Sequence, residues 1–122
     1  MRETKYWTWH IVAGAVILFL LGLHMLVMHL YQLLGTWGLN PVGGAAVAWL
    51  NVLARSRMTA MVVIYILLLG AALYHGLYGL RTILFELGPG KALQMAVNVV
   101  FWIGGIGLFV LGTVAAIAAK ML

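Results

Sequence analysis

Histidines and an arginine placed inside long apolar runs are the residues of this chain that could do chemistry. His75 lies deep in one such run, and Arg81 follows it six residues later. An imidazole in hydrocarbon is unfavourable without a partner, so an ionisable residue inside a membrane-spanning segment indicates a functional site. A neutral imidazole is also an axial ligand of haem iron. The sequence therefore predicts either that His75 ligates haem or that it hydrogen-bonds a neighbouring helix.

Small residues surround His75 at helical spacing. Ala71, Ala72 and Gly79 lie on or beside the same helical face. They would leave room for a flat macrocycle, and they would equally allow close contact with another helix. Arg81 lies about 9 Å further along the helix axis, near the membrane interface. There it could neutralise haem propionates, hydrogen-bond a quinone carbonyl, or simply extend its head towards water.

Three further histidines lie in the first apolar segment. His10 and His24 are fourteen residues apart, which puts them nearly on one face and about 21 Å apart along a helix. His29 is rotated by about 140° from His24 around the helix axis, so the two side chains cannot both contact one partner directly. Bulky side chains surround His24, whereas Tyr31 beside His29 is typical of an interface. Either of them could be the iron ligand of this segment.

The composition predicts the environment in which these residues act. The chain of 122 residues is 66% apolar and 7% charged, with a mean hydropathy of +1.13. Such a composition cannot supply the polar surface of a soluble domain, so we predict an integral membrane protein. The chain has no cysteine, which excludes disulfides, thiolate haem ligands and iron–sulfur ligands within it. The net charge of +5 comes from few residues and forms no basic stripe, which argues against nucleic-acid binding.

The apolar pattern predicts an all-α membrane protein with one domain over residues 1–122. Three transmembrane helices are expected at about residues 7–34, 58–85 and 92–119. A short interfacial helix over residues 45–56 should precede the second span, after a turn-rich connection over residues 35–44. Gly88-Pro89-Gly90 should end the second span.

Charged residues at the ends of the spans give a prediction of orientation. Four cations against three favour a cytoplasmic N-terminus. The first group contains Arg2, Lys5, Arg81 and Lys91, and the second contains Arg55, Arg57 and Lys120.

The third span has the composition of a scaffold. Asn98 is the one strongly polar group well inside it, and small residues recur along it, including Gly104, Gly105, Gly107 and Gly112. Such residues favour packing against other helices. This chain would supply one axial histidine to each haem, so a partner subunit must supply the other axial ligand. We therefore expect a multi-subunit helical bundle.

Three spans with the motif His-x3-Gly-Leu-Arg-x4-Glu-Leu-Gly at the end of the second resemble the cytochrome b membrane-anchor subunits of succinate dehydrogenase and fumarate reductase. The motif is carried by His75, Gly79, Arg81, Glu86 and Gly88. In the first span, His10-Ile11-Val12-Ala13-Gly14 followed by His24 is similar to the branch of that family with two haems. Many relatives with one haem carry Ser and Arg where this chain has Trp7 and Ile11.

The resemblance implies specific roles. His75 would be an axial ligand of one haem b, with Gly79 beside it, and His24 would ligate a second haem. Arg81 would lie near the propionates or the quinone. The resemblance also implies a quinone site at the ends of the spans, with Trp9, His10, Arg81 and Glu86 as candidates.

The resemblance further implies a function in a prokaryotic cytoplasmic membrane. The chain would anchor a succinate:quinone or quinol:fumarate oxidoreductase, in which electrons pass between iron–sulfur clusters and quinone. Its partners would be a second anchor subunit, an iron–sulfur subunit and a flavoprotein subunit, and the chain would take no part in the dicarboxylate chemistry.

Two other interpretations of the sequence stay open. One is a small transporter or channel subunit in which histidines relay protons. Such a protein is expected to hold an acidic residue at mid-membrane, whereas Glu3 and Glu86 stand at the ends of spans. The other is a structural anchor of the same enzyme that binds no haem.

Overall fold

A computed structural model describes residues 2–37 and 45–122 of the chain. Within these ranges the protein is all-helical, with α1 at Arg2–Thr36, α2 at Trp49–Ser56, α3 at Thr59–Glu86 and α4 at Lys91–Met121. The helices α1, α3 and α4 are long and apolar enough to cross a membrane. The three predicted spans are thereby confirmed, although each helix extends one to five residues past the predicted limits at one or both ends. Most of the predicted 35–44 connection lies outside the described residues. The short helix begins at Trp49, four residues later than predicted, because residues 45–48 form a turn in which Ala48 N–H donates to the carbonyl oxygen of Ala45 at 3.0 Å.

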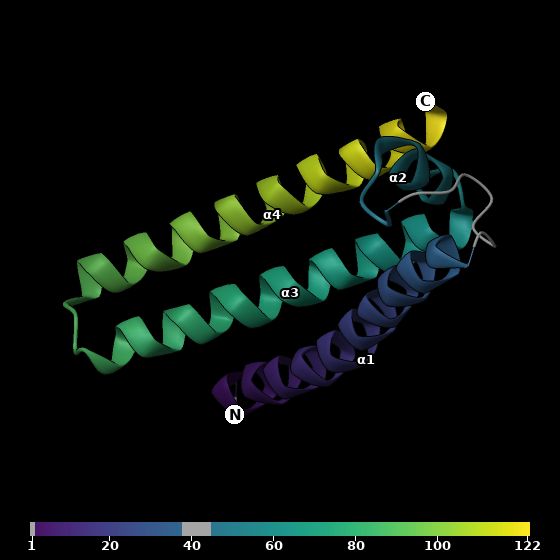
Figure 1. Cartoon of the computed structure of the whole chain (residues 1–122). Coiled ribbons are helices and arrows are strands. Elements are labelled where there is room, and N and C mark those ends of the chain that lie inside the picture. The colour runs from purple at the N-terminus through teal and green to yellow at the C-terminus, as the bar shows by residue number, and fades with distance from the viewer. Residues whose placement is uncertain (1, 38–44) are drawn as a thin grey trace.

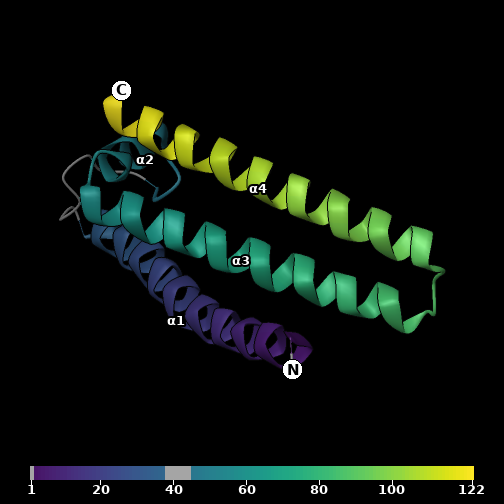
Figure 2. The ribbon, with the colours of Figure 1, turned by 180° about the vertical axis from the view of Figure 1, so that it is seen from behind.

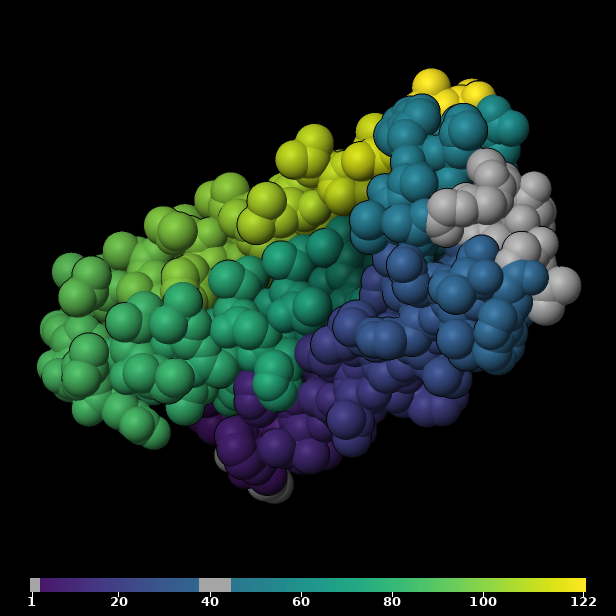
Figure 3. All heavy atoms as spheres, viewed as in Figure 1, coloured from purple at the N-terminus to yellow at the C-terminus, as the bar shows by residue number. Residues whose placement is uncertain are grey.

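The helix α3 lies between α1 and α4 (Figures 1 and 2). Both α1 and α4 pack against α3, and their own backbones are not neighbours within the described helices. Consecutive long helices run in opposite directions, so the N-terminus and the α3–α4 turn share one end of the molecule. The C-terminus lies beside α2 at the other end (Figure 1). In the space-filling view, the atoms of α3 separate those of α1 from those of α4 (Figure 3).

Glycines allow α4 to approach α3 closely. A Cβ atom at Gly105 would lie 2.9 Å from Leu77 Cδ1, and one at Gly112 would overlap the side chain of Leu69. Gly104 and Gly107 have no such neighbour, so only part of the predicted small-residue surface is used. Without a hydrophobic driving force between helices in lipid, close van der Waals packing of this kind holds spans together.

The short helix α2 turns its polar side chains inward. Asn51 and Arg55 are buried, whereas Trp49 and Leu50 are 66% and 61% exposed. Arg55 Nη2 donates a hydrogen bond of 2.5 Å to the carbonyl oxygen of Ala46. The buried polar groups therefore satisfy backbone carbonyls that precede the helix. The exposed side of α2 is apolar, a surface suited to contact with lipid.

The turn between α3 and α4 begins where the sequence predicts it. Gly88 has a φ of +68°, which favours glycine, and its N–H donates to the carbonyl oxygen of Phe85 at 3.1 Å. This left-handed residue ends α3 and lets α4 return along it. The turn sets the register in which Arg81 meets Asn98.

Candidate functional site

The side chain of His75 lies between α3 and α1, in contact with His10. His75 Nδ1 donates a hydrogen bond of 3.0 Å to the backbone carbonyl oxygen of His10. Because a carbonyl oxygen only accepts, Nδ1 carries a proton, and Nε2 is the nitrogen that holds the lone pair when the ring is neutral. Histidines that bind metals commonly donate their other ring N–H to a carbonyl in this way.

The imidazole rings of His75 and His10 stack face to face. Their centroids are 4.1 Å apart and their planes differ by 4°. In stacked rings the nitrogen lone pairs lie in parallel planes, so the two rings cannot point at one iron atom placed between them. If His75 ligates an iron, the opposite ligand has to come from another residue than His10.

Two glycines make this contact possible. A Cβ atom at Gly14 would lie 3.0 Å from His75 Cε1, and one at Gly79 would lie 3.2 Å from His10 Cε1. Each helix carries a His-x3-Gly sequence, and the antiparallel pairing places each histidine over the glycine of the other helix. The space that Gly79 leaves is thus occupied by the ring of His10. Close helix contact, one of the two interpretations of these small residues, is present.

Aromatic residues enclose the histidine pair on the N-terminal side of α1. Trp7 stacks on His10 with centroids 5.4 Å apart, and Tyr78 lies 5.3 Å from the same ring. The hydroxyl of Tyr74 donates to the backbone carbonyl oxygen of Tyr6 at 3.0 Å. The Nδ1 atom of His10 is buried and has no hydrogen-bond partner among the described residues.

His24 and His29 are separate from this pair. His24 meets the ring of Tyr65 edge-on, with centroids 5.5 Å apart. Tyr65 precedes His75 by ten residues of α3, so His24 and His75 lie about 15 Å apart along the helices, too far to share one iron. His29 is exposed, and its Nδ1 donates to the carbonyl oxygen of Met25 on its own helix at 2.8 Å.

The donor chemistry fits haem b in part. His75 is half-buried, and its hydrogen bond to the His10 carbonyl fixes the tautomer that an axial ligand needs. The described residues contain no group of three or more histidines or acids that could hold a metal ion alone. Each of His75 and His24 could thus provide one axial ligand, and the other would have to come from outside these contacts.

Arg81 connects all three long helices. Its Nε atom donates a hydrogen bond of 2.6 Å to Asn98 Oδ1 on α4, and its Nη1 lies 3.8 Å from Glu3 Oε2 on α1. Its guanidinium also lies 4.2 Å from the ring centroid of Phe85. The sequence by itself shows Asn98 only as a lone polar group inside its span. The signal that pairs it with Arg81 is spacing: Arg81 lies five residues before the end of α3 and Asn98 seven residues after the start of α4, so the turn brings them to a similar depth.

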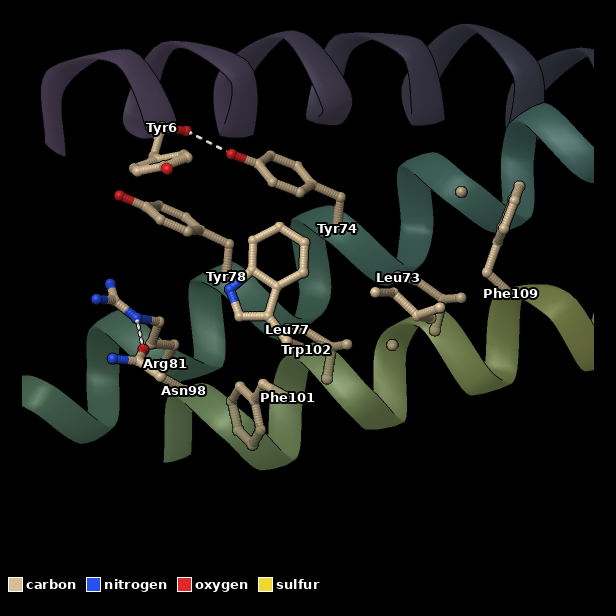
Figure 4. A pocket seen from close by; sticks show the side chains of 13 residues that line it. Tyr6, Leu73, Tyr74, Leu77, Tyr78, Arg81, Asn98, Phe101, Trp102 and Phe109 are labelled. Atoms are coloured by element: carbon tan, nitrogen blue, oxygen red, sulfur yellow. Dashed lines mark hydrogen bonds between the residues drawn. The ribbon is translucent and has the colours of Figure 1, made fainter. Parts of the chain in front are cut away.

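Arg81 and Asn98 form the polar end of a pocket of about 540 Å³ between α3 and α4. The pocket continues between the helices to Gly70 and Phe109, and Trp102 lies along it (Figure 4). The other quinone-site candidates do not line it: Glu86 is exposed, Trp9 is 57% exposed, and His10 faces α3 on the α1 side. Of the four quinone-site candidates, Arg81 is the one that lines this pocket.

No protein-family model matches this chain, and comparisons with curated proteins and with solved structures found no similar protein.

Proposed function

We propose that this protein is the haem b-binding membrane anchor of a succinate:quinone or quinol:fumarate oxidoreductase. The observation that carries the proposal is the hydrogen bond from His75 Nδ1 to the His10 carbonyl oxygen. It leaves Nε2 of a half-buried, intramembrane imidazole as a lone-pair donor, which is the form that ligates iron. The motif from His75 to Gly88 supports the same assignment.

In this proposal the chain holds haem through His75 and, at a second position, through His24. A bound haem supplies one-electron transfer between the iron–sulfur clusters of a docked subunit and quinone. The carbonyl of His10 and the ring stacked on His75 fix the orientation of that imidazole. Gly79 gives His10 the space to do so.

Arg81 is the strongest of the proposed quinone contacts. It is a cation with a side chain 22% exposed, and Asn98 holds its Nε in a fixed position. Its remaining N–H groups can donate to a quinone carbonyl at the membrane boundary. Trp9, His10 and Glu86 stay candidates for contacts that form together with the partner subunits.

The proposed partners are a second anchor subunit, an iron–sulfur subunit and a flavoprotein subunit, in a prokaryotic cytoplasmic membrane with the N-terminus on the cytoplasmic side. Most large apolar side chains of α4 are exposed. A second anchor packed on this surface would complete the helical bundle. It would also bring the missing axial ligands.

The test is the haem content of the complex purified with its partners. We expect a reduced-minus-oxidised spectrum with a b-type signal, and His75→Ala should remove one haem because the iron loses a ligand. His29→Ala tests the other candidate of α1, and we expect unchanged haem content because His29 Nδ1 bonds the carbonyl oxygen of Met25 on its own helix. His24→Ala should remove a second haem where two are present. Full haem content in the His75→Ala complex would contradict the proposal.

The haem content also distinguishes the proposed anchor from the alternative, a transporter or channel with a histidine proton relay. In such a relay, protons pass along hydrogen bonds between neighbouring groups. The rings of His10 and His75 are stacked, and no hydrogen bond runs from one ring to the other within the described residues. The hydrogen bond of His75 goes to the backbone carbonyl of His10 and not to its ring. A purified complex without a b-type signal, combined with proton flux that His75→Ala abolishes, would favour the relay instead.

A further inference from the structure

The pocket between α3 and α4 has one charged end and an otherwise apolar lining. Arg81 and Asn98 lie at that end, beside the ring of Tyr78 (Figure 4). The rest of the lining is apolar or aromatic: Leu73, Leu77, Phe101, Trp102, Ile106 and Phe109. The shape therefore suits an amphiphile with one polar head and one apolar chain.

The position of the pocket along α3 matches one leaflet of a membrane. The helix has 28 residues, or about 42 Å, against a hydrocarbon thickness of about 30 Å. Arg81 lies five residues before the end of α3, about 7.5 Å, which places it at the hydrocarbon boundary when the helix is centred. Gly70, at the other end, is about 16 Å deeper, close to the half-thickness of about 15 Å.

The size of the pocket suits a slender apolar occupant. It offers about 540 Å³ over a length of about 16 Å along α3. One hydrocarbon chain can lie along the two helices in this space.

The charge at the polar end selects an anionic head. The ion pair between Arg81 and Glu3 is 3.8 Å long, and the Glu3 side chain is 72% exposed. Such an exposed pair contributes little to stability, so an incoming anion can displace the carboxylate of Glu3. Lys91 at the start of α4 and the exposed Glu86 at the end of α3 lie at the same end of the molecule and offset each other. A guanidinium fork matches the geometry of a phosphate group better than that of a single neutral carbonyl.

From these observations we propose that the α3–α4 pocket binds an anionic phospholipid of the leaflet that faces the α3–α4 turn. The phosphate is held by Arg81, beside Asn98, and one acyl chain lies between Leu77 and Trp102 towards Phe109. This proposal does not depend on haem ligation, and it gives Arg81 a phosphate partner in place of the quinone carbonyl considered above. It assigns Arg81 and Asn98 a role in fixing a lipid between two spans.

The test is native mass spectrometry of the 122-residue chain in mild detergent with equal amounts of dioleoyl phosphatidylglycerol and dioleoyl phosphatidylcholine. We expect about fivefold higher occupancy by the anionic lipid, the effect of one cation at a membrane surface. Arg81→Gln should abolish this preference and Arg81→Lys should retain most of it. Helical circular dichroism of each variant checks that it is folded.

A second pair of variants tests the pocket without changing any charge. Ile106→Trp places a larger side chain in the pocket and should greatly reduce lipid retention. Ile103→Trp is the matched control, because Ile103 is 69% exposed and lies outside the lining. It should retain the lipid, and this pair decides the matter if Arg81→Gln does not fold.

Several outcomes would overturn the proposal. The first is equal occupancy by the two lipids, and the second is full lipid retention in Ile106→Trp. The third is a dimer of the chain that Ile106→Trp abolishes, since a second copy would then occupy the pocket. A further arm adds decylubiquinone. Binding of this quinone with no binding of phosphatidylglycerol would assign the pocket to quinone instead.

Discussion

At the scale of single residues, the proposed function depends on how the imidazole of His75 is held. Its Nδ1–H binds the carbonyl of His10, its face stacks on the ring of His10, and its edge lies against Gly14. These three contacts restrict both the tautomer and the orientation of the ring. A ligand that is oriented before iron binds loses less conformational entropy on binding.

Gly14→Ala tests this packing. The added Cβ would lie 3.0 Å from His75 Cε1, so the ring or the helix has to move. Overpacking lowers stability by about 1–3 kcal/mol, while alanine improves helix propensity by up to about 1 kcal/mol. We expect the free energy of unfolding to fall by about 1 kcal/mol, measured by unfolding in mixed detergents and followed by circular dichroism.

Gly22→Ala is the matched control on the same helix. Nothing lies within 4 Å of a Cβ atom at Gly22, so this variant should be as stable as the original protein or slightly more stable. Equal stability of the Gly14→Ala and Gly22→Ala variants would show that the His75 contact with α1 is loose.

At the scale of elements, α2 reverses the polarity pattern of a soluble helix. Arg55 is 3% exposed, its guanidinium bonds the carbonyl of Ala46, and it lies 4.8 Å from the ring centroid of Tyr31. The sequence predicts that apolar and polar residues take opposite sides of this segment. It does not say which side faces the protein, because that depends on whether lipid or water surrounds the helix.

Arg55→Ala should therefore be destabilising although it removes a charge. Hydrogen bonds to charged groups contribute about 1.5–3 kcal/mol, and the carbonyl of Ala46 would lose its donor. We expect a decrease of about 2 kcal/mol in the free energy of unfolding. Arg57→Ala is the comparison, because Arg57 is exposed and bonds the carbonyl of Leu122 at the surface. Its effect should stay within about 0.5 kcal/mol, and similar losses in both variants would contradict the buried role of Arg55.

At the scale of the whole molecule, three antiparallel spans put the two ends of α4 on opposite sides of the membrane. The N-terminus and the α3–α4 turn share one end, and α2 and the C-terminus share the other (Figure 1). Arg57 and Lys120 both lie at the second end, where Lys120 Nζ donates to Thr59 Oγ1 at 2.6 Å. The grouping of charges that the sequence predicted by counting spans therefore agrees with the fold.

Single cysteines can test this arrangement because the chain has none of its own. Leu87 and Met121 are 78% and 83% exposed and lie at opposite ends. In sealed inside-out vesicles, an impermeant maleimide should label Leu87→Cys and leave Met121→Cys unlabelled if the N-terminus is cytoplasmic. The reverse pattern would invert the orientation, and equal labelling of the two cysteines in intact vesicles would contradict the crossing of the membrane by α4.

The sequence by itself determined the three long helices, the short helix before the second of them, and the glycine turn, because apolar length and left-handed glycine are local properties. It also singled out His75 and Arg81, because ionisable groups in hydrocarbon are unfavourable wherever the chain goes. Only the tertiary structure decided their partners. Helix rotation and register place His75 against His10 and Gly14, and Arg81 against Asn98, and these depend on packing between segments that are distant in the sequence.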